Sequence, residues 1–237
     1  MLCAVIGKRC YDEFGTSLTE HFGSLFVLPP DTSVAPEVAD HPDMILSFVG
    51  DALVIPRGYY DANRELCREI ADASCRRTVL SDAPRSKDYP HDIGMNALVT
   101  GRHLFGRLSY VSPEVLTLAG ESGLSAIDVK QGYAACSALS CGDVIITGDA
   151  SIKQAAEANG YGVIFTDTSG IKLDGYSHGF IGGSGGIFGN TAYFLGDPSS
   201  TPGTESLTAE LSRHGISSVA LSGSCLTDYG GIKIFKM

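Results

Sequence analysis

Four reactive side chains and one glycine recur at similar places along this chain, each a few residues ahead of a short apolar segment. They are Asp43, Asp92, Cys136, Gly183 and Cys225. A cysteine reacts as a nucleophile only as its thiolate, which forms when a proton acceptor or a positive charge lies nearby. Thiols and carboxylates gathered at one point would therefore provide the groups that a cysteine-dependent reaction needs.

Histidines accompany several of these positions. His41 precedes Asp43 by two residues, His91 adjoins Asp92, and His178 precedes a glycine-rich stretch. Imidazole titrates near neutral pH and serves most often as the general acid or base in enzymes. We take Cys136 and Cys225 as alternative nucleophiles, and His41 and His178 as alternative acid–base residues.

The apolar segments themselves recur about every 45 residues, an interval typical of repeat architectures. The five segments are DALVIP from Asp51, NALVTG from Asn96, DVIITGD from Asp143, NTAYFLGD from Asn190 and GIKIF from Gly231. In a pseudo-fivefold ring, equivalent positions of the units face one another around the axis. The residues ahead of the segments would then meet at one place.

Each unit is expected to contain two strands, a helix and a third strand. The expected helices are 61–73, 112–119, 151–159 and 204–214, and the strands that follow them are 77–80, 126–129, 162–166 and 218–221. Asp61, Ser112 and Ser151 are the expected N-caps, since their side-chain oxygens can accept from free backbone N–H groups.

The two ends of the chain look like complementary halves of one unit. Residues 2–6 and 25–28 are expected strands flanking a weak helix at 12–22, and residues 225–235 are an expected hairpin. Pairing the ends would shut the ring and remove unpaired sheet edges. We predict one α/β domain over residues 1–237, a closed five-bladed propeller of strand-strand-helix-strand units. A three-layer open α/β sheet is the alternative.

Composition limits the partners of this chain. The net charge is −10, with 17 basic residues, which argues against nucleic acid and favours a small cationic ligand. No apolar run approaches 18 residues, and the N-terminus lacks the order of a secretory signal, so we expect no membrane span and a cytoplasmic location. The sequence does not indicate an oligomeric state.

The cysteines and glycines do not form the usual cofactor motifs. Seven cysteines contain no Cys-x-x-Cys pair, so we expect reduced thiols and no metal site. The run Gly182 to Gly186 lacks the Gly-Lys-Ser/Thr ending of a nucleotide loop and leads into a strand. We expect it to be a hairpin entrance where backbones approach closely, and we expect no cofactor.

The unit pattern, the His41-Pro42-Asp43 element before a strand and the cysteine in the last hairpin resemble the pentein, or guanidine-modifying-enzyme, superfamily. The chain is similar to an uncharacterised prokaryotic family with this fold. The segments that carry this similarity are Tyr89-Pro90 with Asp92 and Asn96, Gln131-Gly132-Tyr133 with Cys136-Ser137, and Gly179 to Gly183 with Gly185.

The resemblance implies a chemistry. Enzymes of the superfamily include arginine and agmatine deiminases, amidinotransferases and dimethylarginine hydrolases. In them a cysteine near the C-terminus attacks the guanidinium carbon, a histidine acts as general acid and base, and carboxylates hold the guanidinium nitrogens. Cys225 stands at the corresponding place, and Asp43, Asp92, Asn96 and Gly183 are the expected substrate-binding residues.

Two functions from different classes follow. The first is a cysteine-dependent hydrolase or amidinotransferase-like enzyme acting on a small guanidino, amidino or related cation. The second is a pentein ring that binds a ligand or partner without catalysis, as the superfamily's ribosome anti-association factor 6 does. The chain lacks the Glu-Gly-Gly-Asp clamp of the enzymes, and its nearest counterpart, Ile181-Gly182-Gly183-Ser184, has no acid.

Overall fold

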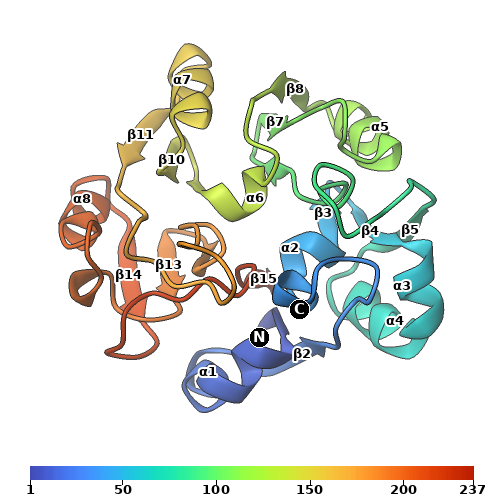
Figure 1. Ribbon diagram of the computed structural model, residues 1–237, viewed down its shortest axis with the longest axis horizontal. Helices are drawn as coiled ribbons and strands as arrows, with labels where there is room; N and C mark the ends of the chain where they lie inside the picture. Colours follow the sequence, from blue (N-terminus) through green and yellow to red (C-terminus); the bar gives the residue numbers. More distant parts are fainter.

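A computed structural model describes residues 1–237 as five three-stranded sheets placed around a central axis (Figure 1). In every sheet the first strand pairs antiparallel with the second, and the third pairs parallel with the second. The first strands are β3 (Ser47–Val49), β6 (Leu98–Val99), β9 (Ala138–Cys141), β12 (Gly185–Phe188) and β15 (Lys233–Lys236). The middle strands are β4 (Ala52–Pro56), β7 (His103–Gly106), β10 (Val144–Thr147), β13 (Thr191–Phe194) and β1 (Leu2–Gly7).

Helices connect each middle strand to the third strand of its sheet and lie at the outside of the ring (Figure 1). They are α3 (Arg57–Ala62) with α4 (Arg64–Ala73), α5 (Pro113–Glu121), α7 (Ala150–Ala158), α8 (Leu207–Arg213) and α1 (Lys8–His21). The third strands are β5 (Arg77–Ser81), β8 (Ser125–Asp128), β11 (Gly162–Phe165), β14 (Ser217–Ala220) and β2 (Ser24–Leu28). The expected unit of two strands, a helix and a strand is confirmed.

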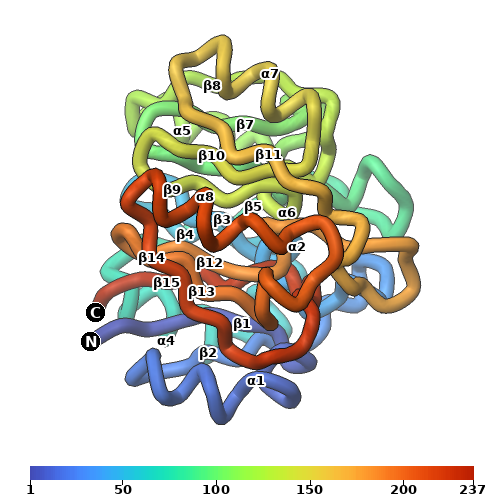
Figure 2. Tube along the Cα trace, turned by 90° about the vertical axis from the view of Figure 1, so that its left-hand side faces the viewer, coloured from blue at the N-terminus to red at the C-terminus, as the bar shows by residue number.

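The two ends of the chain together complete the fifth sheet. The C-terminal strand β15 pairs antiparallel with β1, Ala4 lying opposite Ile234, and β2 pairs with the other edge of β1. The N- and C-termini consequently lie side by side (Figure 2). This is the pentein propeller that the sequence predicts. The alternative of one open sheet is wrong, because the strands fall in five separate sheets.

The five recurring sequence segments do not all correspond to the same strand of the structural unit. DALVIP, DVIITGD and NTAYFLGD contain middle strands, whereas NALVTG and GIKIF contain the first strands β6 and β15. The predicted hairpin at 225–235 is also wrong. Only β15 forms there, because Gly230 and Gly231 adopt positive φ angles and the preceding segment makes a single bridge between Thr227 and Lys172.

The helices begin and end close to the predicted positions, with local differences at their starts. Ser112 is the N-cap residue of α5 and Pro113 is its first residue, as expected, but the Ser112 side chain accepts no hydrogen bond from the first turn and donates to Glu114 instead. Asp149, not Ser151, caps α7 by accepting from the Ser151 and Ile152 backbone N–H groups. The predicted helix at 61–73 is two helices, because Asn63 has a non-helical φ of −131° between α3 and α4. Asp61 therefore lies inside α3.

The apolar core consists of six clusters, of which five lie between two neighbouring blades and the sixth is a small group of Val34, Val38, Ala39 and Met44. Leu53 and Ile55 of β4 pack against the fifth blade, whereas Ala52 and Val54 pack against the second. This division follows from the strand period of two, which sends alternate side chains to opposite faces. None of the helices combines the length and the apolar character needed to cross a membrane.

The first strands of all five blades surround the axis. They line a channel of about 200 Å³ that is bordered by Ser47, Leu98, Ala138, Gly185 and Lys233 among others. Glycines allow this approach: a Cβ on Gly186 would lie 2.2 Å from the Ile232 carbonyl oxygen. The expectation that the glycine-rich run marks a close backbone approach is confirmed.

We expect Phe235→Ala to lower the free energy of unfolding by about 3–5 kcal/mol, measured by urea denaturation. Phe235 is 4% exposed, lies in the cluster between the fifth and first blades and stacks on Phe26 at 5.9 Å between ring centroids. Met237→Ala is the control, because Met237 is 54% exposed, and it should change the value by about 0.5 kcal/mol or less. Equally small changes in the free energy of unfolding of both variants would show that the packing of β15 contributes little to stability.

Candidate active site

Buried polar side chains gather at one end of the axis, in the segments that lead into the first strands. His41 precedes the short helix α2 (Pro42–Ile45), which carries Asp43 and leads into β3. Cys136 lies in α6 (Ala134–Ser137), directly before β9, and Asp228 lies in the segment before β15. His41, Asp43 and Asp228 are each 1% exposed and Cys136 is 5% exposed. Five repeats thus bring residues far apart in sequence to one point.

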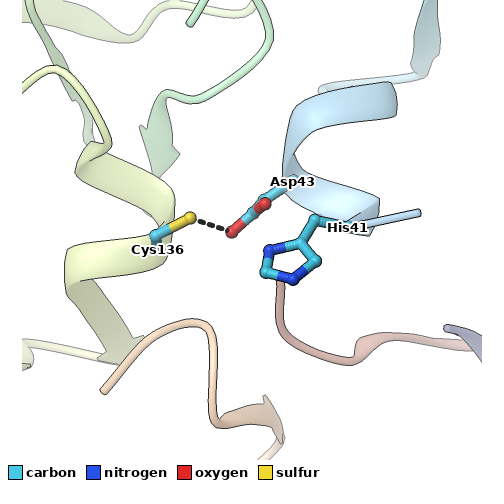
Figure 3. Close-up of side chains that lie close together, drawn as sticks. All are labelled: His41, Asp43 and Cys136. Carbon is cyan, nitrogen blue, oxygen red and sulfur yellow. Dashed lines mark hydrogen bonds between the residues drawn. The ribbon is translucent and has the colours of Figure 1, made fainter. Parts of the chain in front are cut away.

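The central contact joins the thiol to a carboxylate. Cys136 Sγ donates to Asp43 Oδ2 at 2.6 Å, across the gap between α6 and α2 (Figure 3). A ring nitrogen of His41 lies within 4.8 Å of both the thiol sulfur and an Asp43 oxygen. The three side chains point toward one another from two helices of different blades (Figure 3). A proton can therefore leave the thiol for a neighbouring base.

Asn96 fixes the position of this thiol. Its side-chain Oδ1 accepts from the backbone N–H groups of Ala135 at 2.8 Å and Cys136 at 3.2 Å, and its Nδ2 donates to Cys136 Sγ at 3.2 Å. Asn96 is fully buried. The sequence predicts that Asn96 binds substrate, which stays a prediction; in the structure its side chain lies at the start of α6 and hydrogen-bonds the thiol.

Asp228 is the site residue that the sequence analysis missed. Its carboxylate accepts from the backbone N–H of Phe180 at 2.9 Å and of Gly230 at 3.0 Å, and Oδ1 lies 3.8 Å from His41 Nδ1. Gly183 makes room for it, since a Cβ there would lie 1.9 Å from Asp228 Oδ1. The sequence signal for Asp228 is its place ahead of the last strand, which it shares with Cys225 in the same segment.

A cavity of about 190 Å³ opens onto these groups. His41, Cys136 and Asp228 contribute its polar wall, and the remaining wall is mostly aromatic or apolar, formed by Tyr133, Tyr176, Phe180, His178, Val38, Met44 and Leu173. The ring centroids of Tyr133 and Phe180 lie 6.4 Å apart. The thiol consequently faces a small enclosure suited to the reacting group of a ligand.

Burial and mutual repulsion set the protonation of the site. Burial first, and then the charges of Asp43 and Asp228, raise the pKa of the Cys136 thiol well above its usual value. Burial raises the pKa of Asp43 to about 6, and burial together with Asp43 raises that of Asp228 to about 7. Burial, with a contribution from Arg9, lowers the pKa of His41 to about 3. Without a cation, the site holds a neutral thiol beside a neutral imidazole.

Several polar atoms of the site have no protein partner. Both ring nitrogens of His41 and the Oδ1 atoms of Asp43 and Asp92 are buried and unpaired. Buried polar groups are normally hydrogen-bonded, so these atoms are available to a ligand or water. His41, Asp43 and Cys136 also offer a nitrogen, an oxygen and a sulfur within 4.8 Å, a donor set that suits Zn²⁺. The sequence-based expectation that the chain holds no metal stays a prediction.

The structure thus brings most of the predicted site residues together. His178 lies on the cavity wall, and the Gly183 backbone N–H donates to the Cys136 carbonyl at 2.8 Å. Asp92 does not line the cavity. Its Oδ2 accepts from the Tyr133 hydroxyl at 2.7 Å and so positions the Tyr133 ring, which does. Cys225 lies apart from this group, half-exposed, with its thiol donating to the Ser200 carbonyl at 3.1 Å.

The comparisons with known proteins agree on the fold. A family model described as a family of unknown function (DUF6873) matches residues 5–233. No curated protein matches the chain in sequence. Among solved structures, a mutant of DDAH from Pseudomonas aeruginosa complexed with citrulline is similar with a TM-score of 0.56, at 11% identity over 93% of this chain and 92% of that one.

Two further structures are similar over part of their length. ArgZ, an arginine dihydrolase from the ornithine-ammonia cycle in cyanobacteria, has a TM-score of 0.55 at 11% identity, covering 92% of this chain and 36% of that chain. AgrE in a ternary complex with ornithine and NAD⁺ has a TM-score of 0.56 at 10% identity, covering 94% and 38%. At these identities the likeness establishes the guanidine-modifying-enzyme fold.

The raised pKa values of Asp43 and Asp228 predict a dependence of stability on pH. An unfolded aspartate ionises near pH 3.8, whereas these two ionise in the folded chain near 6 and 7. Between those limits the unfolded state binds fewer protons, so each carboxyl makes the unfolding free energy fall as pH rises. His41 opposes this between about pH 3 and 6.5, because only the unfolded chain binds its proton there.

Asp228→Asn isolates one of these contributions. The unfolding free energy of the variant minus that of the wild type should rise between about pH 4 and 7, by on the order of 1.4 kcal/mol per pH unit. Urea denaturation of both proteins at several pH values measures this difference. Parallel stability curves would contradict the raised pKa of Asp228.

Proposed function

The chain belongs to the family of unknown function DUF6873 and has the fold of the guanidine-modifying enzymes, and we propose that it is a cysteine-dependent hydrolase or amidinotransferase-like enzyme acting on a small guanidino or amidino cation. Cys136 is the proposed nucleophile. One observation carries this proposal: the Cys136 thiol donates to Asp43 at 2.6 Å beside a cavity that also exposes His41 and Asp228. Two structurally similar proteins, a dimethylarginine dimethylaminohydrolase and an arginine dihydrolase, support the substrate class.

A cationic ligand would balance the negative charge of the carboxylates in the site. Asp228, which lines the cavity, can accept charge-assisted hydrogen bonds from guanidinium N–H groups, and the Asp43 carboxylate adds negative charge next to the thiol. A positive charge beside Cys136 also offsets the two carboxylates that keep its pKa high. Ligand binding would therefore favour the thiolate at the moment when a carbon for it to attack is present.

The chemistry then divides into two displacements. The thiol proton passes to Asp43, whose pKa of about 6 makes it a stronger base than an ordinary aspartate. The thiolate forms an S–C bond to the guanidinium carbon. One C–N bond breaks as its nitrogen takes the proton from Asp43, and the amine leaves an S-linked amidinium on Cys136.

Water completes a hydrolysis. It loses a proton to His178 on the cavity wall and attacks the same carbon, after which the C–S bond breaks and the sulfur regains a proton. The products are an amine and a urea or ureido compound. In a transferase, a second amine would take the place of water.

The alternative is a ring that binds a cation without catalysis. The specific observation in its favour is that burial and two carboxylates raise the pKa of the Cys136 thiol well above its usual value. A thiol that remains protonated with the ligand present would not react. Reactivity of the thiol toward cationic reagents separates these two functions.

Cys136→Ser should abolish turnover of the guanidino substrate, a loss of at least about 10³-fold, because a serine hydroxyl in this acidic site does not ionise. Cys225→Ser is the matched control and should retain activity, because its thiol lies against Ser200 and outside the cavity. Release of ammonia or urea from a panel of guanidino compounds measures turnover. Full activity in Cys136→Ser, or its loss in Cys225→Ser alone, would reject Cys136 as the nucleophile.

Charge selectivity of alkylation is a second test. 2-Chloroacetamidine and 2-chloroacetamide have the same leaving group and differ in charge. The acidic site should therefore make the ratio of the amidine alkylation rate to the amide alkylation rate at least about tenfold higher at Cys136 than at a solvent-exposed thiol. The exposed thiol of Cys75 in the same protein supplies the internal reference. Peptide mapping by mass spectrometry gives both rates. Equal rate ratios at the two cysteines would favour the non-catalytic alternative.

A further inference from the structure

The walls of the Cys136 cavity differ sharply in character. One side presents Asp228, with Asp43 behind the thiol, and these are acceptors for a cation. The other side presents Tyr133, Phe180 and Tyr176 with aliphatic neighbours. The faces of Tyr and Phe rings attract cations and pack against apolar carbon. Both sides therefore favour a positively charged head on an apolar substituent.

No lysine or arginine on the cavity wall balances this negative charge. The residues that line the cavity include neither lysine nor arginine. Lys233 acts electrostatically on Asp43, and Arg9 acts on His41, but neither side chain lines the cavity, and Lys233 borders the axial channel. A ligand carboxylate or phosphate entering the cavity would lose its hydration and find no lysine or arginine to pair with, which is unfavourable.

The rim is acidic as well. Glu37 packs beside Gly175, where a Cβ would lie 2.6 Å from Glu37 Cγ. Burial, and then the charge of Glu37, raise the pKa of the neighbouring Tyr176 hydroxyl. Tyr176 is 49% exposed and belongs to the cavity wall. A negative group on the distal part of a ligand would therefore meet a like charge at the entrance.

The size of the cavity limits the substituent. Its volume of about 190 Å³ is below the roughly 300–1,000 Å³ that is typical of pockets for drug-sized ligands. A guanidinium group occupies part of this space, which leaves room for only a small substituent before the ligand reaches the rim. A short alkyl or a single aryl substituent meets this limit.

We infer that the ligand of this site is a guanidinium or amidinium compound with a short, uncharged apolar substituent and with no carboxylate or phosphate. This inference rests on the proposed function, because it specifies the substrate of the same site. It excludes free arginine and its N-methylated forms, whose α-carboxylate would lie at the acidic rim.

Protection of Cys136 from alkylation by 2-chloroacetamide measures binding without requiring turnover. The matched probes are n-butylguanidine and L-arginine, which share the guanidinium and the carbon chain, whereas butylguanidine lacks the α-amino and α-carboxylate groups. Half-protection by butylguanidine should need a concentration at least about tenfold lower than by arginine. Equal or better protection by arginine overturns the inference, as does a lack of protection by both probes at millimolar concentration.

A substitution at the rim should weaken the preference for butylguanidine over arginine. Tyr176→Arg adds a positive charge at the entrance on a side chain that is 49% exposed, so the fold should tolerate it. It should lower the ratio of the half-protecting concentration of arginine to that of butylguanidine by at least about fivefold. Tyr11→Arg is the control, since Tyr11 is 43% exposed on α1 and does not line the cavity. An unchanged ratio in Tyr176→Arg, or the same change in Tyr11→Arg, counts against the acidic rim as the cause.

Turnover separates this inference from the proposed function. If butylguanidine protects Cys136 selectively but releases neither ammonia nor urea, the proposed enzyme fails and the assigned ligand class stands. If arginine is hydrolysed with a higher kcat/KM than butylguanidine, the enzyme stands and the ligand class fails.

Discussion

The antiparallel pairing of β15 with β1 is the constraint on which the rest of this structure depends. It joins the two ends of the chain into one blade, so that the first strands of all five blades surround the axis. Five of the apolar clusters lie between neighbouring blades, and the cluster between the fifth and first blades includes Phe235 of β15 itself. Closure thus forms the last of these interfaces and fixes where the segments ahead of the first strands meet.

The same closure forces polar groups into an interior that they would not otherwise occupy. His41, Asp43 and Asp228 are nearly inaccessible, and His41 and one oxygen of Asp43 have no protein partner. Burying such groups without partners is unfavourable, and the apolar interfaces between blades must offset that cost. Local instability of this kind is concentrated at functional sites, where the unpaired groups await a ligand. The acidic cavity and its protonated thiol are consistent with a site that becomes electrostatically balanced only when a cation binds.

The pseudo-symmetry also explains how this chain departs from the enzyme pattern that its sequence resembles. That pattern places the nucleophile near the C-terminus, in the last unit. Here the residue of the last unit that faces the cavity is Asp228, and the thiol that faces it comes from the third unit, on α6. Because the five segments converge on one axis, a thiol and a carboxylate can occupy different units and still lie side by side. The position of Cys136 against Asp43 and His41 is one such arrangement.

The sequence by itself determined the unit, its fivefold recurrence and the complementary chain ends, because strand and helix periodicities and turn residues act over short distances. It also indicated His41, Asp43, Cys136 and His178, since each stands just ahead of a first strand. It did not distinguish Asp228 from Cys225, three residues apart, because contacts with distant segments hold each side chain: Asp228 accepts from the Phe180 N–H at the cavity, and the Cys225 thiol donates to the Ser200 carbonyl. Nor did it show that Asn96 orients the thiol or that aromatic rings enclose it. Those properties arise from contacts between blades, which exist only after the ring has closed.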